Sequence, residues 1–162
     1  MDPESPNPAP RIEPPRGFYS GRVDEKGRLK LPARFQEYLG GLPDKTFFIT
    51  TLGDGIARIY PISVWKENEA ILENFTEDPE AAQRLAFLAN AYGSDSEIDG
   101  QGRVMLSQEL RRKLELENQG VQLMFYRGRI DVYRHTAFEA QLAEAEASSQ
   151  KDRAALGKAG VK

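Results

Sequence analysis

A nine-residue stretch decides how this sequence is organised, and it occurs twice: VDEKGRLKL at residues 23–31 and IDGQGRVML at residues 98–106. Both copies run from an apolar residue to Asp, two variable residues, Gly, Arg, an apolar residue, one variable residue and Leu. Equivalent residues are 75 positions apart, since 99 − 24 = 75 and 103 − 28 = 75. A fixed period of this kind indicates a fold built from two related halves.

Each copy has the pattern of two strands joined by a tight turn. The glycine can adopt positive φ at little steric cost, and alternation of apolar and polar residues resumes after it. The aspartate stands at the mouth of the turn. We therefore expect four residues to brace the two turns: Asp24, Gly27, Asp99 and Gly102.

The arginine of each copy, Arg28 or Arg103, has two interpretations. It can pair with the aspartate four residues earlier and brace the turn. It can also point outward as a planar, permanently charged fork suited to phosphate or guanine. Two copies in matching context favour the functional interpretation.

Composition excludes several classes of protein. The chain has 162 residues, of which 29% are charged and 40% hydrophobic, as in a soluble globular protein of one domain or two small halves. It has no Cys, so disulfides, thiolate metal sites and cysteine nucleophiles are excluded. The single histidine, His135, and the lack of phosphate-binding glycine motifs predict no enzyme, no catalytic residue, no metal and no cofactor. Without a signal peptide or a transmembrane stretch, we expect a cytoplasmic protein with no membrane partner.

Positive charge collects on the two repeats although the net charge is −3. Residues 16–34 carry six basic against two acidic residues, and residues 98–113 carry four against two. Residues 66–97, between them, carry eight acidic against two basic residues. The local field decides where a polyanion docks, so a nucleic acid is the expected partner.

The sequence predicts six segments. They are a disordered Pro-rich tail (1–15), a first half (16–64), a helical connection (65–92), a second half (93–137), a C-terminal helix (138–147) and a frayed tail (148–162). Both halves carry a hairpin, turning at Asp54-Gly55 in the first and Arg127-Gly128 in the second. Expected helix starts are Ser63, Asp78-Pro79, Ser107 and a capping box of Thr136 with Glu139.

Together these residues resemble the MraZ proteins, bacterial transcriptional regulators built from two SpoVT-AbrB-type halves with an Asp-x-x-x-Arg signature each. Supporting matches are Arg16-Gly17, Leu31-Pro32 and Tyr60-Pro61-x-Ser63-x-Trp65, so the resemblance covers roughly residues 16–140. It implies a β-rich α+β fold: a double-split β-barrel, or swapped-hairpin AbrB-like fold, of two tandem pseudo-repeats with added helices. It also implies a ring-like homo-oligomer associated with the nucleoid, which binds double-stranded DNA at promoter repeats of its own division and cell-wall gene cluster.

The resemblance also assigns site residues. The signature arginines are DNA-facing in the family, and the second half resembles AbrB in Gly102-Arg103 followed by Glu109-Leu110-Arg111-Arg112. The first half has Gln36 and Glu37 in place of that last arginine pair, and Gly100-Gln101 removes the charges that Glu25-Lys26 carry. We therefore expect the first half to contribute more to DNA binding than the second. The expected DNA-binding residues are Arg28, Arg103, Lys26, Arg22, Lys30, Arg34, Arg111 and Arg112.

The leading hypothesis is a sequence-specific DNA-binding transcriptional regulator. The alternative is an antitoxin-like protein-interaction module with the same barrel, which the long Pro-rich tail favours and the lack of an extended C-terminal arm opposes. An enzyme or metal protein has almost no residues to support it. Binding that depends on Arg28 separates the first hypothesis from the second.

Overall fold

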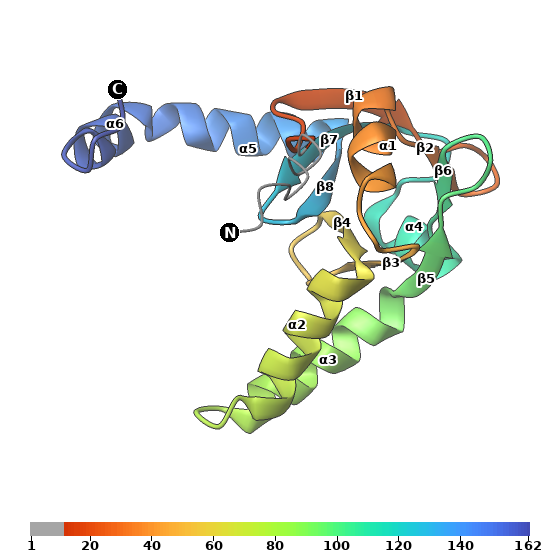
Figure 1. The fold of residues 1–162 in the computed structure, drawn as a ribbon. Helices are drawn as coiled ribbons and strands as arrows, with labels where there is room; N and C mark the ends of the chain where they lie inside the picture. Colours follow the sequence, from red (N-terminus) through yellow and green to blue (C-terminus); the bar gives the residue numbers. More distant parts are fainter. Residues whose placement is uncertain (1–11) are drawn as a thin grey trace, which may run out of the picture.

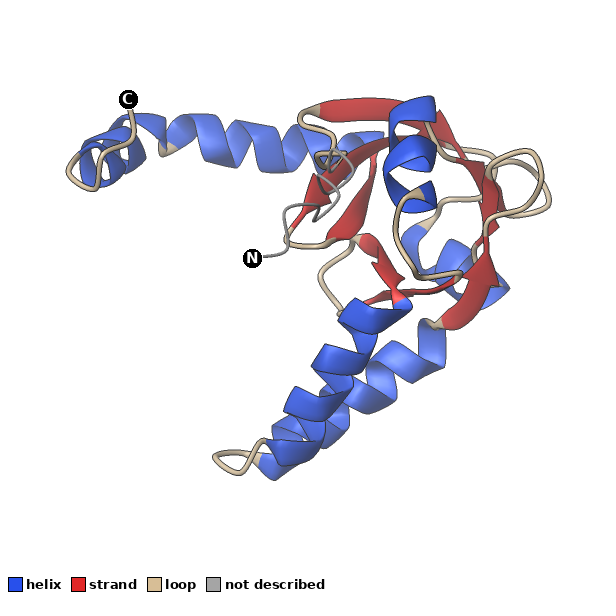
Figure 2. Ribbon diagram, viewed as in Figure 1, coloured by secondary structure: helices blue, strands red, loops and turns tan. Residues whose placement is uncertain are grey.

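Eight strands and six helices make up residues 12–162, the part of the chain that the computed structural model describes. All strand pairs are antiparallel, and the helices lie outside the sheets (Figure 2). The fold is therefore mixed α+β and rich in strands, which confirms the predicted class. Most of the predicted Pro-rich tail, residues 1–11, lies outside the described residues.

The strands form two sheets that are connected at their edges. In chain order the strands are β1 (Phe18–Arg22), β2 (Arg28–Lys30), β3 (Thr46–Thr51), β4 (Ala57–Pro61), β5 (Ser94–Glu97), β6 (Arg103–Met105), β7 (Gly120–Tyr126) and β8 (Arg129–Arg134). Six of them form one sheet in the order β1-β7-β8-β4-β3-β5, while β2 and β6 pair separately as a two-stranded ribbon. Because β1 leads into β2 and β5 leads into β6, the ribbon links the two edge strands of the larger sheet.

The two halves are joined strand by strand around a pseudo-two-fold axis. Only the hairpins β3–β4 and β7–β8 pair within one half; the other described pairs, β1–β7, β3–β5, β4–β8 and β2–β6, cross between halves. At the centre of the ribbon Leu29 lies opposite Val104, its repeat equivalent. At the centre of the sheet Arg58 lies opposite Asp131, which is its equivalent once the shorter second hairpin loop is allowed for.

The hairpins form where turn residues interrupt β-branched and aromatic runs. In the second half, Arg127 and Gly128 connect β7 to β8 with φ of 49° and 85°, the positive values that a two-residue hairpin turn requires. In the first half the loop is longer, and Gly55 takes a φ of 78°. Both predicted hairpins are confirmed.

The hydrophobic core is shared by the two halves. Leu31 and Leu106, which end the two motifs, are 1% and 0% exposed, and they pack in one cluster with Phe35 and Leu110 of the following helices. Full burial of each such side chain stabilises the fold by about 1.5–3 kcal/mol. Neither half has this core by itself, because its buried residues come from both.

A charged cluster lies buried where β4 meets β8. Arg58 donates from Nη1 to Asp54 Oδ1 at 2.9 Å, and its Nε lies 3.6 Å from Asp131 Oδ1. Arg129 Nε donates to the same Asp131 oxygen at 2.9 Å. Burial raises the pKa of the Asp131 carboxyl, although the Arg129 cation opposes that rise. Arg58 and Asp131 are the buried members, at 8% and 3% exposure, and removing either would leave an uncompensated buried charge between the paired strands.

Some helices lie against the strands, and others extend away from them in two directions (Figure 1). They are α1 (Ala33–Gly40), α2 (Ile62–Asn74), α3 (Pro79–Tyr92), α4 (Gln108–Leu114), α5 (His135–Ala147) and α6 (Ser149–Gly157). α2 and α3 form an antiparallel helical hairpin, whereas α5 is a separate arm that ends in α6 (Figure 1). No helix among residues 12–162 is both long and apolar enough to span a membrane.

Two of the predicted helix caps are confirmed. Asp78 accepts a hydrogen bond from Ala81 N at 3.0 Å, with Pro79 at the first helical position of α3. Ser107 Oγ accepts one from Leu110 N at 3.2 Å at the start of α4. Each side chain satisfies one of the backbone donors that a helix leaves free at its N-terminus.

Two other predicted caps are wrong. α2 begins at Ile62, so Ser63 lies inside the first turn, and Asp44 accepts from both Ser63 N and Ser63 Oγ, at 2.9 and 3.1 Å. α5 begins at His135, and Thr136 Oγ1 accepts from Arg134 Nε at 3.0 Å instead of capping the helix. In both cases the helix begins directly after the strand, two residues earlier than the cap pattern predicts.

The C-terminal segment also differs from the prediction. Residues 149–157 form α6 where the sequence indicated a frayed tail. The segment SQKDRAALG is rich in Ala, Leu, Lys, Arg and Gln, which have high helix propensity. All of its residues are exposed, so local propensity and not core packing accounts for this helix.

Candidate nucleic-acid interface

The first motif folds into a turn braced by its aspartate. Asp24 Oδ1 accepts hydrogen bonds from the backbone N–H of Lys26 and of Arg28, both at 2.9 Å. The backbone closes the turn as well, with Gly27 N donating to Asp24 O at 3.0 Å and Asp24 N to Arg28 O at 2.9 Å. Gly27 has a φ of +84°, which explains why the motif has glycine there.

The second motif repeats this geometry. Asp99 Oδ1 accepts from Gln101 N at 2.8 Å and from Arg103 N at 3.0 Å, and Gly102 has a φ of +76°. These hydrogen bonds favour the charged carboxylate. The backbone N–H of Arg28 and that of Arg103 thus lower the pKa of Asp24 and Asp99 respectively, against an opposing effect of burial.

The two motif arginines combine both interpretations that the sequence left open. Arg28 Nε donates to Asp24 Oδ2 at 2.8 Å, and Arg103 Nε donates to Asp99 Oδ2 at the same distance. Within residues 12–162 neither arginine uses its terminal Nη atoms in a hydrogen bond. Each guanidinium is therefore oriented through Nε while its two-pronged end remains available to an anion or a guanine edge.

The ribbon brings the two arginines onto one surface. Side chains alternate across a strand, so the buried Leu29 and Val104 put their neighbours on the opposite, outward face. Arg28 is paired with Met105, and Lys30 with Arg103. We call these four side chains the ribbon face; three of the four are cations.

Positive charge around the ribbon is stronger on the first-half side. Arg22, Lys26, Lys30 and Arg34 are exposed there, and the repeat places Glu97, Gln101, Met105 and Glu109 at the equivalent positions of the second half. Both sets are exposed, so this contrast is a property of the surface. The backbone is thus nearly two-fold symmetric, whereas the exposed positive charge lies mainly on the first-half side.

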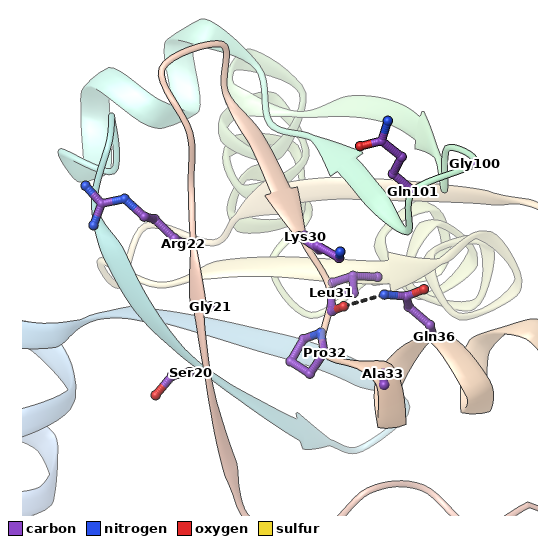
Figure 3. A pocket seen from close by; sticks show the side chains of 10 residues that line it. All are labelled: Ser20, Gly21, Arg22, Lys30, Leu31, Pro32, Ala33, Gln36, Gly100 and Gln101. Carbon is purple, nitrogen blue, oxygen red and sulfur yellow. Dashed lines mark hydrogen bonds between the residues drawn. The ribbon is translucent and has the colours of Figure 1, made fainter.

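A groove of about 730 Å³ lies on the basic side, between β1, β2 and the turn of the second motif. Arg22 of β1 and Lys30 of β2 line it together with Gly100 and Gln101 of the second turn, and the Arg22 guanidinium points away from the other three (Figure 3). Arg22 is held by Asn118, whose backbone oxygen and Oδ1 accept from Nη2 at 2.9 and 3.0 Å.

The structure places the predicted residue Arg111 apart from the ribbon face. Its side chain is 12% exposed, and Nη1 donates to Leu106 O at 2.6 Å. A Cβ built on Gly27 would lie 1.8 Å from that Nη1, so the guanidinium packs beneath the first turn. Arg112, the next residue, is exposed on α4. Arg111 therefore supports the turn, and we leave it out of the interface proposed below.

The sequence patterns did not indicate where two side chains near the motifs lie. Met105 is a variable position of the motif, and its pairing with Arg28 puts it on the ribbon face. The packing of Gln36 beneath the second turn was also missed, because it arises between halves. A signal existed for both, since the constant spacing makes Met105 equivalent to Lys30 and Gln36 equivalent to Arg111.

Comparison with known proteins identifies the family. The sequence model described as "MraZ protein, putative antitoxin-like" matches residues 87–158. A transcriptional regulator MraZ of Acidobacterium capsulatum is 34% identical over 146 residues, covering 90% of this chain and 99% of the relative. Those of Koribacter versatilis (37% over 105 residues; 64% and 71%) and Desulforamulus reducens (33% over 138 residues; 83% and 92%) are also similar.

A braced, cationic β-ribbon on an α+β scaffold defines a protein of the nucleic-acid-binding class. The chain belongs to the MraZ family. This confirms the resemblance found in the two motifs. It also agrees with the prediction of a transcriptional regulator and not an enzyme, since these relatives are named as transcriptional regulators.

Proposed function

We propose that this protein is a sequence-specific transcriptional regulator that binds double-stranded DNA through the ribbon face. One observation carries the proposal: Arg28, Lys30 and Arg103 lie side by side on one face of a two-stranded ribbon, and a carboxylate orients each arginine. The outer ends of both arginines are free within the described chain, so the face is built for an external anionic partner.

The chemistry of DNA fits this face. The major groove admits a two-stranded β-ribbon, and an arginine fork can donate two hydrogen bonds to the O6 and N7 atoms of guanine. Arg28 and Arg103 then read bases. The lysines and the remaining arginines neutralise phosphates, which positions the ribbon without reading sequence.

The first half makes the larger share of DNA contacts in this proposal. Four of its exposed residues are basic where the second half has acidic or neutral residues, and two of them, Arg22 and Lys30, line the groove next to β2. The proposed interface consists of Arg22, Lys26, Arg28, Lys30, Arg34, Arg103 and Arg112.

We further propose the double-split barrel, with repeat units at residues 16–64 and 93–137. The linkage of edge strands β1 and β5 through the ribbon supports a closed, barrel-like arrangement. The hairpins meet at β4 and β8, so each unit contributes one hairpin to a common sheet. This is the relation that a swapped-hairpin fold requires.

The apolar surfaces of the helices support a homo-oligomer. Phe18 and Leu142, 42% and 45% exposed, line an apolar hollow between β1, β7 and α5. On the helical hairpin, Ile71 and Phe87 are 63% and 78% exposed. Because these two surfaces differ, contact between them is heterologous, and repeated heterologous contact forms a ring when the rotation between subunits closes. We propose that the hairpin of one subunit covers the hollow of the next.

A ring would present several ribbons to one DNA molecule. The second and later contacts are then intramolecular, which raises affinity through effective concentration without any new type of contact. Repeated sites in the promoter of the protein's own division and cell-wall gene cluster are the targets we propose. Binding them places the protein at the nucleoid.

Fluorescence anisotropy tests the proposal. The probe is a duplex from upstream of the protein's own gene, with a scrambled duplex as competitor and a salt series for each protein. We expect specific, salt-sensitive binding that Arg28→Ala and Arg103→Ala each weaken by about 1–3 kcal/mol. Arg84→Ala is the matched control, because Arg84 is 69% exposed on α3, away from the ribbon.

The antitoxin-like interaction module remains the second candidate, favoured by the description of the matching family. Two results together would contradict DNA regulation through this face. Wild type would bind DNA weakly or without preference for sequence, and both ribbon variants would have the same affinity as Arg84→Ala. Capture of a protein partner that is indifferent to Arg28→Ala would then support the second candidate.

A further inference from the structure

One side chain of the ribbon face is not a cation. Met105 is 44% exposed and lies directly opposite Arg28 in the ribbon. Its repeat equivalent is Lys30, which lies directly opposite Arg103. The two ends of the face therefore differ: one pairs an arginine with a thioether, the other pairs an arginine with an ammonium group.

The backbone keeps Met105 on this surface. Its neighbours Val104 and Leu106 are 1% and 0% exposed, so both are fixed in the core. Its own N–H donates to Ser96 Oγ at 3.0 Å, which ties this end of β6 to β5. A rotation that buried Met105 would expose the two core residues on either side. The exposed apolar group is thus a fixed part of the ribbon face.

The chemistry of the major groove contains one apolar group, the C5 methyl of thymine. Methionine is unbranched and flexible, so it adapts to an apolar partner whose position is set by other contacts. Directly opposed residues in an antiparallel pair have their Cβ atoms about 4.5–5.5 Å apart. A base pair next to the one that Arg28 contacts is therefore within reach of Met105.

We propose that Met105 reads thymine by contact with its C5 methyl group, next to the base pair read by Arg28. This inference rests on the proposed DNA-binding function of the ribbon. It assigns different specificity to the two ends of one ribbon, because Lys30 beside Arg103 offers charge where Met105 offers apolar surface. The preferred site is then asymmetric even though the backbone is nearly two-fold symmetric.

The test removes the methyl group from the DNA and the thioether from the protein. The duplex from upstream of the gene is prepared with thymine and with uracil at every thymine position, and both are titrated with wild type and Met105→Ala. Burial of one methyl group corresponds to roughly a fourfold change in Kd, so wild type should bind the thymine duplex about fourfold more tightly for each methyl contacted. Met105→Ala should show a thymine-to-uracil ratio smaller than that of wild type by this factor.

Two control variants separate this contact from other effects of uracil. Lys30→Ala, on the same face, should keep the wild-type preference for thymine while its salt dependence falls. Met105→Leu, which retains an apolar side chain, should keep most of the preference. Any effect of uracil on duplex shape is common to all four proteins and cancels in the comparison with Met105→Ala.

The outcomes are distinct. Specific binding by wild type with the same thymine-to-uracil ratio in wild type and Met105→Ala overturns the assignment of Met105 and leaves the DNA-binding proposal standing. No preference of wild type for either duplex over the scrambled one overturns both proposals. A ratio that collapses only in Met105→Ala supports the methyl contact.

Discussion

Gln36 and Arg111 occupy equivalent positions, each beneath the turn of the opposite half. Gln36 Nε2 donates to Leu31 O and Arg111 Nη1 donates to Leu106 O, both at 2.6 Å. A Cβ built on Gly102 would lie 2.2 Å from the Gln36 amide carbon, and one on Gly27 would lie 1.8 Å from Arg111 Nη1. The helix after each motif thus supports the turn of the other motif, so each half contributes to the packing of both turns.

Replacing Gly27 by alanine should destabilise the protein. The new Cβ meets the Arg111 guanidinium, and the φ of +84° costs an L-residue about 1–2 kcal/mol by itself. We expect a loss of at least about 1 kcal/mol in the free energy of unfolding, measured by urea titration. Gly100→Ala is the matched control, since no atom lies within 4 Å of its added Cβ. Equal stability of the two variants would contradict the packing described for the first turn.

Substitution of Arg111 should change the stability of the protein, whereas substitution of Lys30 should change its binding to DNA. Arg111→Ala leaves the Leu106 carbonyl without its buried donor, and we expect a loss of about 1–3 kcal/mol in unfolding free energy. Arg111→Gln, which reproduces the Gln36 arrangement, should recover part of that loss. Lys30→Ala should leave thermal stability unchanged and reduce the salt slope of DNA binding by about one. A salt slope that falls in Arg111→Gln but not in Lys30→Ala would reverse these roles.

The two motif aspartates should stabilise the folded protein at neutral pH and lose this effect in acid. Their folded-state pKa values lie below the usual 3.8, mainly because the backbone N–H of Arg28 or Arg103 binds the carboxylate. A depressed folded pKa gives stability that is present above the unfolded value and lost as pH falls through the folded value. Asp24→Asn and Asp99→Asn should therefore be less stable than wild type at pH 7, and the difference should shrink below about pH 4.

Urea titrations at several pH values measure this difference. Asp152→Asn, an exposed carboxylate on α6, is the control and should follow wild type throughout. A gap between wild type and the motif variants that stays constant down to pH 2 would show that the charge of the carboxylate is not what braces the turns.

Charge placed on either apolar surface should disrupt the proposed oligomer. Leu142→Glu puts a carboxylate in the hollow beside Phe18, and Phe87→Glu puts one on the helical hairpin. We expect each variant to sediment as a smaller species than wild type in analytical ultracentrifugation, because an isolated charge is costly to bury. Val161→Glu, near the end of the chain at 62% exposure, should sediment as wild type. Unchanged sedimentation of both surface variants would rule out this contact.

The motif turns and two of the helix caps could be predicted from the sequence, and long-range pairing could not. Turns at Gly27 and Gly102 and the caps Asp78 and Ser107 depend on residues a few positions apart, so their patterns carry the information. The partner of β1 is β7, which no local periodicity specifies, since alternation defines which face is buried and not which strand lies beside it.

The candidate site was predictable to the same extent. The two arginines and their aspartates follow from the repeat, whereas their arrangement on one face depends on β2 meeting β6. Arg111 shows the same limit, because its charge and its place after the motif suggested exposure. Only the approach of the other half's glycine, visible in three dimensions, buries it.

The pairing of strands between halves has a consequence for synthesis. Phe18 pairs with Met124, and Arg58 pairs with Asp131, so β1 and β4 lack these sheet partners until nearly the whole chain has left the ribosome. The nascent first half therefore carries open strand edges and an unfinished apolar core during most of translation. Two nascent chains on one messenger RNA could pair their open strand edges with each other before either chain is complete. Prompt synthesis of the second half therefore favours folding of each polypeptide on itself.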